Sequence, residues 1–170
     1  MQRAGHIEGA EGARAFTDRT TYPLVVVTTV GEDGTLGGCL AGFLTQCSVE
    51  PTRFLVCISK ANHTFDVMEH ASVLCLHLLG ADQVATASLF GGESGDRVDK
   101  FARTPWHRGI LGVPVLDDCA AWLVVGILQR IDVGDHQALL TYPVVGGTGQ
   151  RNGLLTNRNV PPLEAGHPVA

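Results

Sequence analysis

Runs of β-branched and other apolar residues, separated by short polar or glycine-containing turns, fill most of the chain between residues 21 and 146. Such runs are typical of strands, whereas helical spacing of apolar residues is confined to short segments. Because turns rather than helices connect most of the runs, the pattern predicts an antiparallel barrel or sandwich, mainly β, with a few short helices. The predicted strands span 24–30, 36–47, 54–59, 73–79, 113–116, 120–133 and 137–145, and the predicted helices span 13–19, 62–70 and 81–90.

Glycine, proline and aspartate mark the turns between these elements. Glu32–Thr35 contains the Asp-Gly pair of a tight hairpin, Pro51 interrupts the chain between two strands, and Gly134–His136 forms another tight turn. After residue 146 the chain is rich in glycine, asparagine and proline. We therefore predict three parts: an N-terminal segment at 1–20, one barrel domain at 21–146, and a C-terminal tail or arm at 147–170.

The strand predicted at 36–47 is unusually rich in small residues. Glycine weakens a strand interior, so several glycines close together indicate either that another group packs against the backbone or that the strand bends. A helix start follows at Asn62, where backbone N–H groups and side chains can bind a phosphate or a carboxylate. Two interpretations stay open: a flat, phosphate-bearing ligand along this thin strand, or a tight hairpin followed by a capped helix. The small residues are Gly37, Gly38, Cys39, Ala41 and Gly42.

Composition limits the classes of function that remain. The 170 residues are 45% hydrophobic and 17% charged, which excludes a wholly disordered chain and is compatible with an apolar surface covered by a partner subunit. The net charge is −5 and lysines and arginines do not cluster, so we expect no nucleic-acid partner. No apolar run is long enough to span a bilayer, and residues 1–16 lack the apolar core of a secretory signal, so we expect a soluble cytoplasmic protein.

Cysteine and histidine spacing argues against a metal site. The five cysteines form no C-x-x-C pair and lie in or beside apolar runs, so we expect buried free thiols, with Cys47 at the end of the thin strand. His63, His70 and His77 recur at a fixed interval, but they fall on a helix and a strand and cannot share a face. We predict His70 at the end of a helix and His77 in the core or in a subunit contact.

Three other segments carry candidate binding chemistry. Residues 59–64 combine one cation, Lys60, with hydrogen-bonding side chains and a helix start, which is the donor set that a phosphate requires; capping plus a solvated lysine would give the same pattern. Residues 94–101 mix both charges with one aromatic anchor, which alone indicates a solvated loop. His136 is either a simple exposed turn residue or an imidazole placed to stack, donate a hydrogen bond or change charge near neutral pH. The glycine-rich stretch 91–95 matches neither a Walker loop nor a nucleophile elbow.

Taken in order, these segments resemble the flavin reductase-like family, whose fold is the FMN-binding split barrel. The matching segments are Gly37–Pro51 with its S-x-x-P ending, Phe54–Thr64 with S-K-x-N-x-T, Phe90–Phe101 with F-x-G-x-x-G-D-x-x-D-K-F, and Gly134–His136 with G-D-H. The resemblance implies an antiparallel split β-barrel of Greek-key type and a homodimer that binds FMN or FAD noncovalently near the subunit interface. It also implies hydride transfer from NADH or NADPH to the flavin N5, in many members to supply reduced flavin to a separate monooxygenase.

The site that the resemblance implies has a ring-binding set, a phosphate-binding set and one catalytic residue. The set that lines the isoalloxazine, largely through its backbone, is Gln46, Cys47 and Ser48. The set that holds the ribityl chain and phosphate is Ser59, Lys60, Asn62 and Thr64, with Lys100 near the phosphate or closing the loop over it. His136 faces the nicotinamide. Hydride transfer to a flavin needs no strong nucleophile or paired carboxylates, and the sequence offers neither, so the cofactor would supply the chemistry and the protein its position.

Two departures from the family pattern concern this site. Members often carry Thr and Ser in the thin strand where this chain has Leu40, Ala41 and Gly42, and Pro143 interrupts a strand that often ends in G-x-V. The identity of the flavin therefore stays open. So do a flavin-binding module without reductase activity and an enzyme of the same fold that uses a deazaflavin or acts directly on a small organic substrate.

Overall fold

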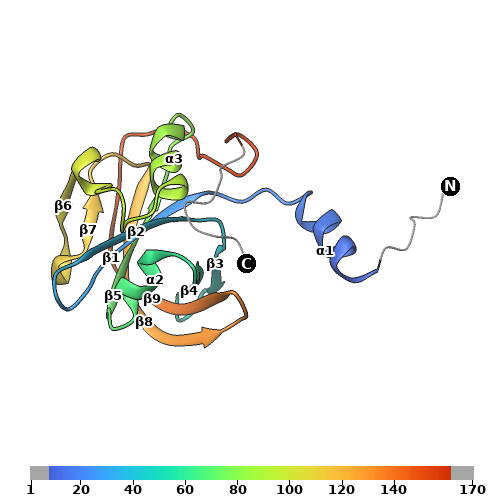
Figure 1. Ribbon diagram of the computed structural model, residues 1–170, viewed down its shortest axis with the longest axis horizontal. Helices are drawn as coiled ribbons and strands as arrows, with labels where there is room; N and C mark the ends of the chain where they lie inside the picture. Colours follow the sequence, from blue (N-terminus) through green and yellow to red (C-terminus); the bar gives the residue numbers. More distant parts are fainter. Residues whose placement is uncertain (1–7, 162–170) are drawn as a thin grey trace.

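The computed structural model describes residues 8–161, which are built around one curled antiparallel sheet (Figure 1). Within it, seven strands follow the order β2-β1-β5-β8-β9-β4-β3, and each neighbouring pair is antiparallel. The predicted mainly β, antiparallel fold is confirmed. The strands are β1 (Val25–Val30), β2 (Leu36–Ala41), β3 (Leu44–Ser48), β4 (Arg53–Ser59), β5 (Val73–Leu78), β8 (Ala121–Asp132) and β9 (His136–Thr148), with β6 (Trp106–Arg108) and β7 (Pro114–Leu116) as a separate hairpin.

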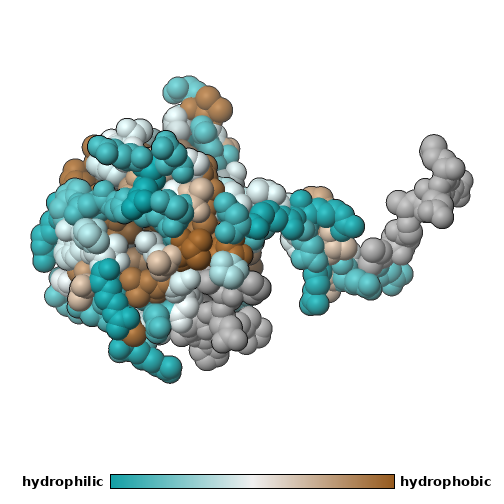
Figure 2. Space-filling model, turned by 90° about the horizontal axis from the view of Figure 1, so that it is seen from above, coloured by the Kyte–Doolittle hydropathy of each residue, from teal (hydrophilic) through white to brown (hydrophobic). Residues whose placement is uncertain are grey.

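Three short helices accompany the sheet within the described residues. α2 (His63–Met68) and α3 (Val84–Gly92) pack against the sheet, whereas α1 (Gly9–Thr17) projects away from it and buries none of its residues (Figure 1). Figure 2 shows this projection as a mainly hydrophilic arm, and shows apolar surface on the body near the point where the arm leaves. No helix between residues 8 and 161 combines the length and the apolar character that crossing a bilayer requires.

The strand predicted at 36–47 is two strands, which lie at opposite edges of the sheet. Only Gly42 and Phe43 separate β2 from β3 along the chain, yet the other five strands of the sheet lie between them. The sheet must therefore curl until its two edges meet at this link. Gly42 makes the link possible, because a Cβ there would lie 2.7 Å from Cε2 of the Tyr22 ring. The single-strand prediction was wrong because the apolar pattern continues through the link without a polar break.

The other glycines of the thin strand are covered by side chains of the protein itself. A Cβ on Gly37 would lie 3.1 Å from Cβ of Val67 in α2, and a Cβ on Gly38 would lie 2.7 Å from Cε1 of Phe90 in α3. Glycine at these positions lets both helices approach the backbone of β2 closely. The small residues of this strand therefore reflect helix packing, and they do not by themselves indicate a ligand along the strand.

The chain beyond β9 completes an apolar cluster between the sheet and α3. Leu155 is fully buried there; its N–H donates to Leu79 O, and its C=O accepts from Leu24 N, each at 2.9 Å. Burying one leucine side chain stabilises a fold by roughly 1.5–3 kcal/mol. β9 also ends at Thr148, three residues later than predicted. The stretch that follows β9 therefore packs back onto the sheet through Leu155.

His77 is a core residue, which confirms one of the two placements predicted for it. Its ring is fully buried, and Leu116 N donates to Nε2 at 3.0 Å. Since Nε2 accepts, Nδ1 carries the proton and donates to Val26 O at 3.0 Å. Burial, with a smaller contribution from His107, lowers the pKa of His77 to about 4, so the ring is neutral near pH 7.

The five cysteines are free thiols, as predicted. Cys39, Cys75 and Cys119 are buried, and burial raises the pKa of each. Cys47 is exposed, contrary to the expectation, because it lies on β3 at the edge of the sheet. An apolar sequence neighbourhood does not distinguish an edge strand from a central one.

Candidate functional site

Three segments that are far apart in the sequence meet at one end of β4. In the pairing of β4 with β9, Ser59 lies opposite His136, and the N–H of Lys60 donates to Asp135 O at 2.9 Å. The turn between β8 and β9 thus lies directly beside the S-K-x-N-x-T segment. The link between β2 and β3 reaches the same place, because the centroids of the Phe43 and His136 rings are 5.4 Å apart. The structure therefore brings Ser59, Lys60 and His136 of the predicted site together.

Lys60 places a positive charge at the surface of this end of the sheet. Its Nζ lies 2.8 Å from Oδ2 of Asp132, whose Oδ1 accepts from Gly134 N at 3.0 Å. The hydrogen bond from Lys60 is the main reason that the pKa of Asp132 is lowered. The Lys60 side chain is 34% exposed and the Asp132 side chain 76% exposed. Lys60 is accessible to a ligand anion, which would compete with a carboxylate on a flexible side chain for it.

His136 is oriented by the residue before it. Its Nδ1 lies 2.8 Å from Oδ1 of Asp135, and this hydrogen bond is the first cause of the lowered pKa of Asp135. A carboxylate can only accept, so the pair fixes Nδ1 as the protonated nitrogen and directs Nε2 away from Asp135. Nε2 is thus the atom that His136 presents to a ligand.

The start of α2 uses its polar side chains first for capping. Asn62 Oδ1 accepts from Thr64 N at 3.0 Å, and Ser59 Oγ accepts from Ala61 N at 3.3 Å. Asn62 is the N-cap, as the sequence predicts. Thr64 is buried, so its side chain faces the core and not the surface. Of the predicted phosphate-binding set, Ser59, Lys60 and Asn62 lie at the surface end, and Thr64 lies beneath them.

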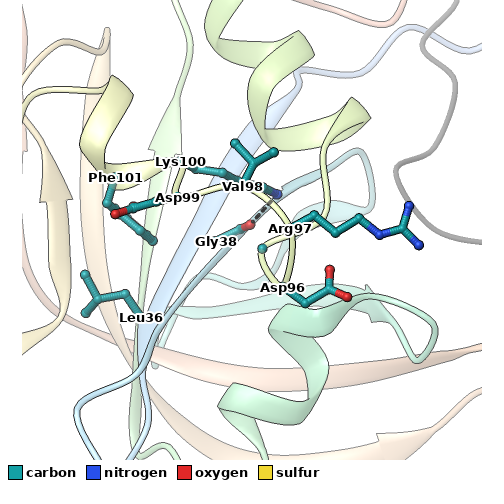
Figure 3. Close-up of a pocket in the computed structure, with 9 residues that line it drawn as sticks. Leu36, Gly38, Asp96, Arg97, Val98, Asp99, Lys100 and Phe101 are labelled. Carbon is teal, nitrogen blue, oxygen red and sulfur yellow. Dashed lines mark hydrogen bonds between the residues drawn. The ribbon is translucent and has the colours of Figure 1, made fainter.

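Lys100 is buried and holds the loop before it against β2. Its Nζ donates to Gly38 O at 3.0 Å (Figure 3). It also donates to Phe90 O at 3.2 Å and lies 5.6 Å from the centroid of the Phe90 ring. Burial is the main cause that lowers the pKa of Lys100. The ammonium group is engaged by backbone carbonyls, so it fixes the loop in place. A contact of Lys100 with a phosphate stays a prediction.

Two hollows lie beside this loop. One, of about 370 Å³, is lined by β2 and by residues 95–101, and Figure 3 shows Arg97 pointing away from Lys100 while Asp96 lies toward α2. The other, of about 380 Å³, is lined by the β1–β2 turn and by α2, including His63. Gly95 of the first hollow and His63 of the second are neighbours, since a Cβ on Gly95 would lie 3.0 Å from Cδ2 of His63. Each volume falls within the range of small-molecule sites.

The predicted ring-binding residues on β3 lie away from Lys60. Gln46 pairs with Phe54 and Ser48 pairs with Arg53, at the other end of β4 from Ser59. At about 3.3 Å per residue, five residues along β4 amount to roughly 16 Å. The Gln46 side chain donates to Ser48 O at 3.1 Å. The structure does not bring Gln46, Cys47 and Ser48 together with the phosphate-binding set, and their contact with a flavin ring stays a prediction.

Sequence reasoning missed Phe43, which lies where the two edges of the sheet meet. The site was placed at the end of the supposed single strand 36–47, whereas the strand breaks at Gly42 and the ring after the break reaches His136. The sequence signal that could have located it is an aromatic residue directly after a glycine in an otherwise thin strand. Asp132 and Asp135 were also missed as the partners of Lys60 and His136.

Comparison with known proteins gives one consistent result. The sequence pattern of the flavin reductase like domain matches residues 17–160. The FMN reductase (NADH) RutF of Pseudomonas syringae pv. syringae is 34% identical over 129 residues, which are 74% of this chain and 71% of that protein. The reductase component of the flavin-dependent trigonelline monooxygenase of Acinetobacter baylyi is 31% identical over 117 residues, which are 69% of this chain and 37% of that protein.

Solved structures share the fold. A flavin reductase domain protein of Arthrobacter superposes with a TM-score of 0.77 at 23% identity, covering 94% of this chain and 96% of that chain. The NADH:FAD oxidoreductase of Streptomyces globisporus superposes with a TM-score of 0.78 at 22% identity, covering 89% of this chain and 92% of that chain. At this level of identity a structural likeness supports the fold, and the function has to be argued from the site.

Proposed function

Because this chain belongs to the flavin reductase like domain family, we propose that it is an NADH- or NADPH-dependent reductase that binds FMN or FAD noncovalently and reduces it by hydride transfer. Relatives named FMN reductase (NADH) support NADH as the donor and FMN as the flavin. The observation that carries the proposal is the assembly at one end of two paired strands, where the Lys60 cation lies beside the oriented imidazole of His136.

The residues at this end of β4 fit a flavin phosphate. The Lys60 ammonium is accessible, and its partner Asp132 is an exposed carboxylate at the end of β8, so the ion pair is weak and exchanges readily with a phosphate. Ser59 and the side-chain amide of Asn62 add hydrogen-bonding groups next to it. Thr64 is buried, and its N–H donates to Asn62 Oδ1, so it supports the capped start of α2 from the core side.

The chain contributes position and electrostatics to the reaction. When bound, the flavin supplies the hydride-accepting chemistry. His136, held through Nδ1 by Asp135, presents Nε2 toward the nicotinamide and limits its orientation. Holding the donor and acceptor rings in contact converts a bimolecular step into an effectively unimolecular one, which alone can lower the barrier by several kcal/mol. No nucleophile or acid–base pair of carboxylates has to act.

The same proposal includes a homodimer and a partner oxygenase that receives the reduced flavin. Half-exposed apolar side chains on β8 and β9 would be covered by a second copy, which removes apolar surface from water; they are Leu128, Tyr142, Val144 and Val145. A relative named as the reductase component of a flavin-dependent monooxygenase supports the partner.

An anaerobic absorbance titration tests the proposal. FMN and then FAD are added to the purified protein, and the flavin band is followed on addition of NADH and then NADPH. Bleaching at a catalytic rate is the expected result, and the faster donor gives the nicotinamide preference. Tight flavin binding without bleaching would instead point to a flavin-binding module or to an enzyme that uses a deazaflavin. No binding of either flavin would refute the proposed site.

A further inference from the structure

An aromatic side chain is held at the surface beside His136. Phe43 is 56% exposed, although it contacts two other rings: its centroid lies 5.4 Å from that of His136 and 6.4 Å from that of Tyr22. A single exposed phenylalanine is ordinary in a folded protein. Core packing does not explain why Phe43 is exposed beside His136, the imidazole that Asp135 orients.

The surrounding structure fixes the position of Phe43. Its carbonyl accepts from Cys57 N at 2.9 Å, which ties the link between the sheet edges to β4. The Tyr22 ring packs against Gly42, the residue before Phe43. Asn157 holds Tyr22 in place through two hydrogen bonds: its Oδ1 accepts from Tyr22 N at 3.0 Å, and its backbone N–H donates to Tyr22 O at 3.1 Å. The ring is therefore preorganised, so a ligand that binds to it orders little additional structure.

The geometry of the three rings leaves aromatic surface free. The planes of Tyr22 and Phe43 are tilted by 53°, and those of Phe43 and His136 by 58°, so neither neighbour stacks face to face on Phe43. Tilted neighbours use ring edges and leave a face available for a flat partner. In the neighbouring His136 ring, Asp135 engages Nδ1 and leaves Nε2 for a ligand.

We propose that Phe43 is the stacking surface for a planar heteroaromatic ring bound at His136. This inference rests on the proposed function for the identity of the ring: the isoalloxazine and the nicotinamide share the required chemistry, and the experiment separates them. Phe43 acts by contact with that ring, so it sets affinity or orientation and takes no proton.

The test compares Phe43→Ala, Phe43→Leu and Phe43→Tyr, with Phe16→Ala as the matched control. Phe16 is also exposed, at 73%, but lies on the projecting helix α1. Riboflavin and FMN affinities are measured by flavin fluorescence without nicotinamide, and KM and kcat for NADH are measured at saturating flavin. Thermal unfolding of each variant establishes that it is folded.

Phe43→Ala is expected to weaken the binding of the stacked ligand, either the flavin or NADH, about tenfold, which is equivalent to about 1.4 kcal/mol. Phe43→Tyr restores the affinity, whereas Phe43→Leu, which is apolar but not aromatic, does not. Equal losses for riboflavin and FMN identify the isoalloxazine as the stacked ring; unchanged flavin affinity with a raised KM for NADH identifies the nicotinamide. The inference is overturned if Phe43→Ala behaves like Phe16→Ala in both assays, or if Phe43→Leu rescues as fully as Phe43→Tyr. A wild-type protein that binds flavin without bleaching, yet loses it in Phe43→Ala, would refute the reductase function and leave the stacking site standing.

Discussion

Replacing His77 with glutamine removes a buried titratable group while keeping a donor and an acceptor in its place. In the folded protein the pKa of His77 is about 4, against 6.5 for an ordinary histidine. Between these two pH values the unfolded chain binds a proton on this ring and the folded protein does not. The contribution of a neutral His77 to stability is therefore complete above pH 6.5 and is lost as the pH falls from 6.5 to 4.

The magnitude follows from the two pKa values. A gap of about 2.5 pH units, at 1.36 kcal/mol per unit, gives a loss on the order of 3 kcal/mol between pH 6.5 and pH 4. A typical domain has 5–15 kcal/mol of stability in total, so this slope is large enough to measure. Glutamine should abolish this part of the slope, because it does not titrate.

Urea unfolding, followed by tryptophan fluorescence at pH 7, 6, 5 and 4.5 and at one protein concentration, measures the effect. The expected result is that wild type and His77→Gln converge as the pH falls, whereas His70→Gln, changed at an exposed histidine, keeps the wild-type slope. Parallel loss of stability in wild type and His77→Gln would refute the assignment. His77→Leu is a second check: Leu116 N and Val26 O lose their partner, which should cost about 2–6 kcal/mol at pH 7. This deficit relative to wild type should narrow as the pH falls, because leucine does not titrate either.

Further predictions concern the site. Lys60→Ala should weaken FMN about 10- to 100-fold but riboflavin little, because only FMN has the phosphate, and equal losses in a fluorescence titration would remove Lys60 from the phosphate site. Asp132→Asn should tighten FMN binding about two- to fivefold, since the carboxylate no longer competes for Lys60, and unchanged or weaker binding in the same titration would show that Asp132 does not compete. His136→Ala should lower kcat more than it weakens flavin binding, and an unchanged kcat for NADH at saturating flavin would contradict its place at the nicotinamide.

The sheet could be predicted because its strands are marked locally. The β-branched run of β1, the Asp-Gly hairpin that follows it and the tight turn before His136 are patterns that a few consecutive residues specify. The break between β2 and β3 was missed because its cause is a contact with Tyr22, twenty residues earlier in the chain. The contact between Gly42 and Tyr22 depends on the register in which the strands pair, and a few consecutive residues do not specify that register.

The site was predictable only in part, for a similar reason. Lys60 and His136 could be found from residue type and turn chemistry, and strand pairing then places them together. Lys100 has the same residue type as Lys60, but its ammonium group is buried because two carbonyls from β2 and α3 meet it there. Thr64 follows the helix cap in sequence, but its side chain is buried in the core. Residue type indicates what a side chain can do, whereas tertiary structure decides which partner it meets.

The packing of Leu155 between Leu24 and Leu79 has a consequence for synthesis. During synthesis the residue before β1 leaves the ribosome early, but the hydrogen bond to Leu155 O and the bridge from Pro23 to Thr156 join residues more than 130 positions apart, so they wait for that much more chain. Contacts of such sequence separation form slowly, and until then apolar strands remain uncovered. A nascent chain of this protein therefore keeps β1 and its neighbours open to chaperones, or to other nascent chains, until translation has passed Thr156.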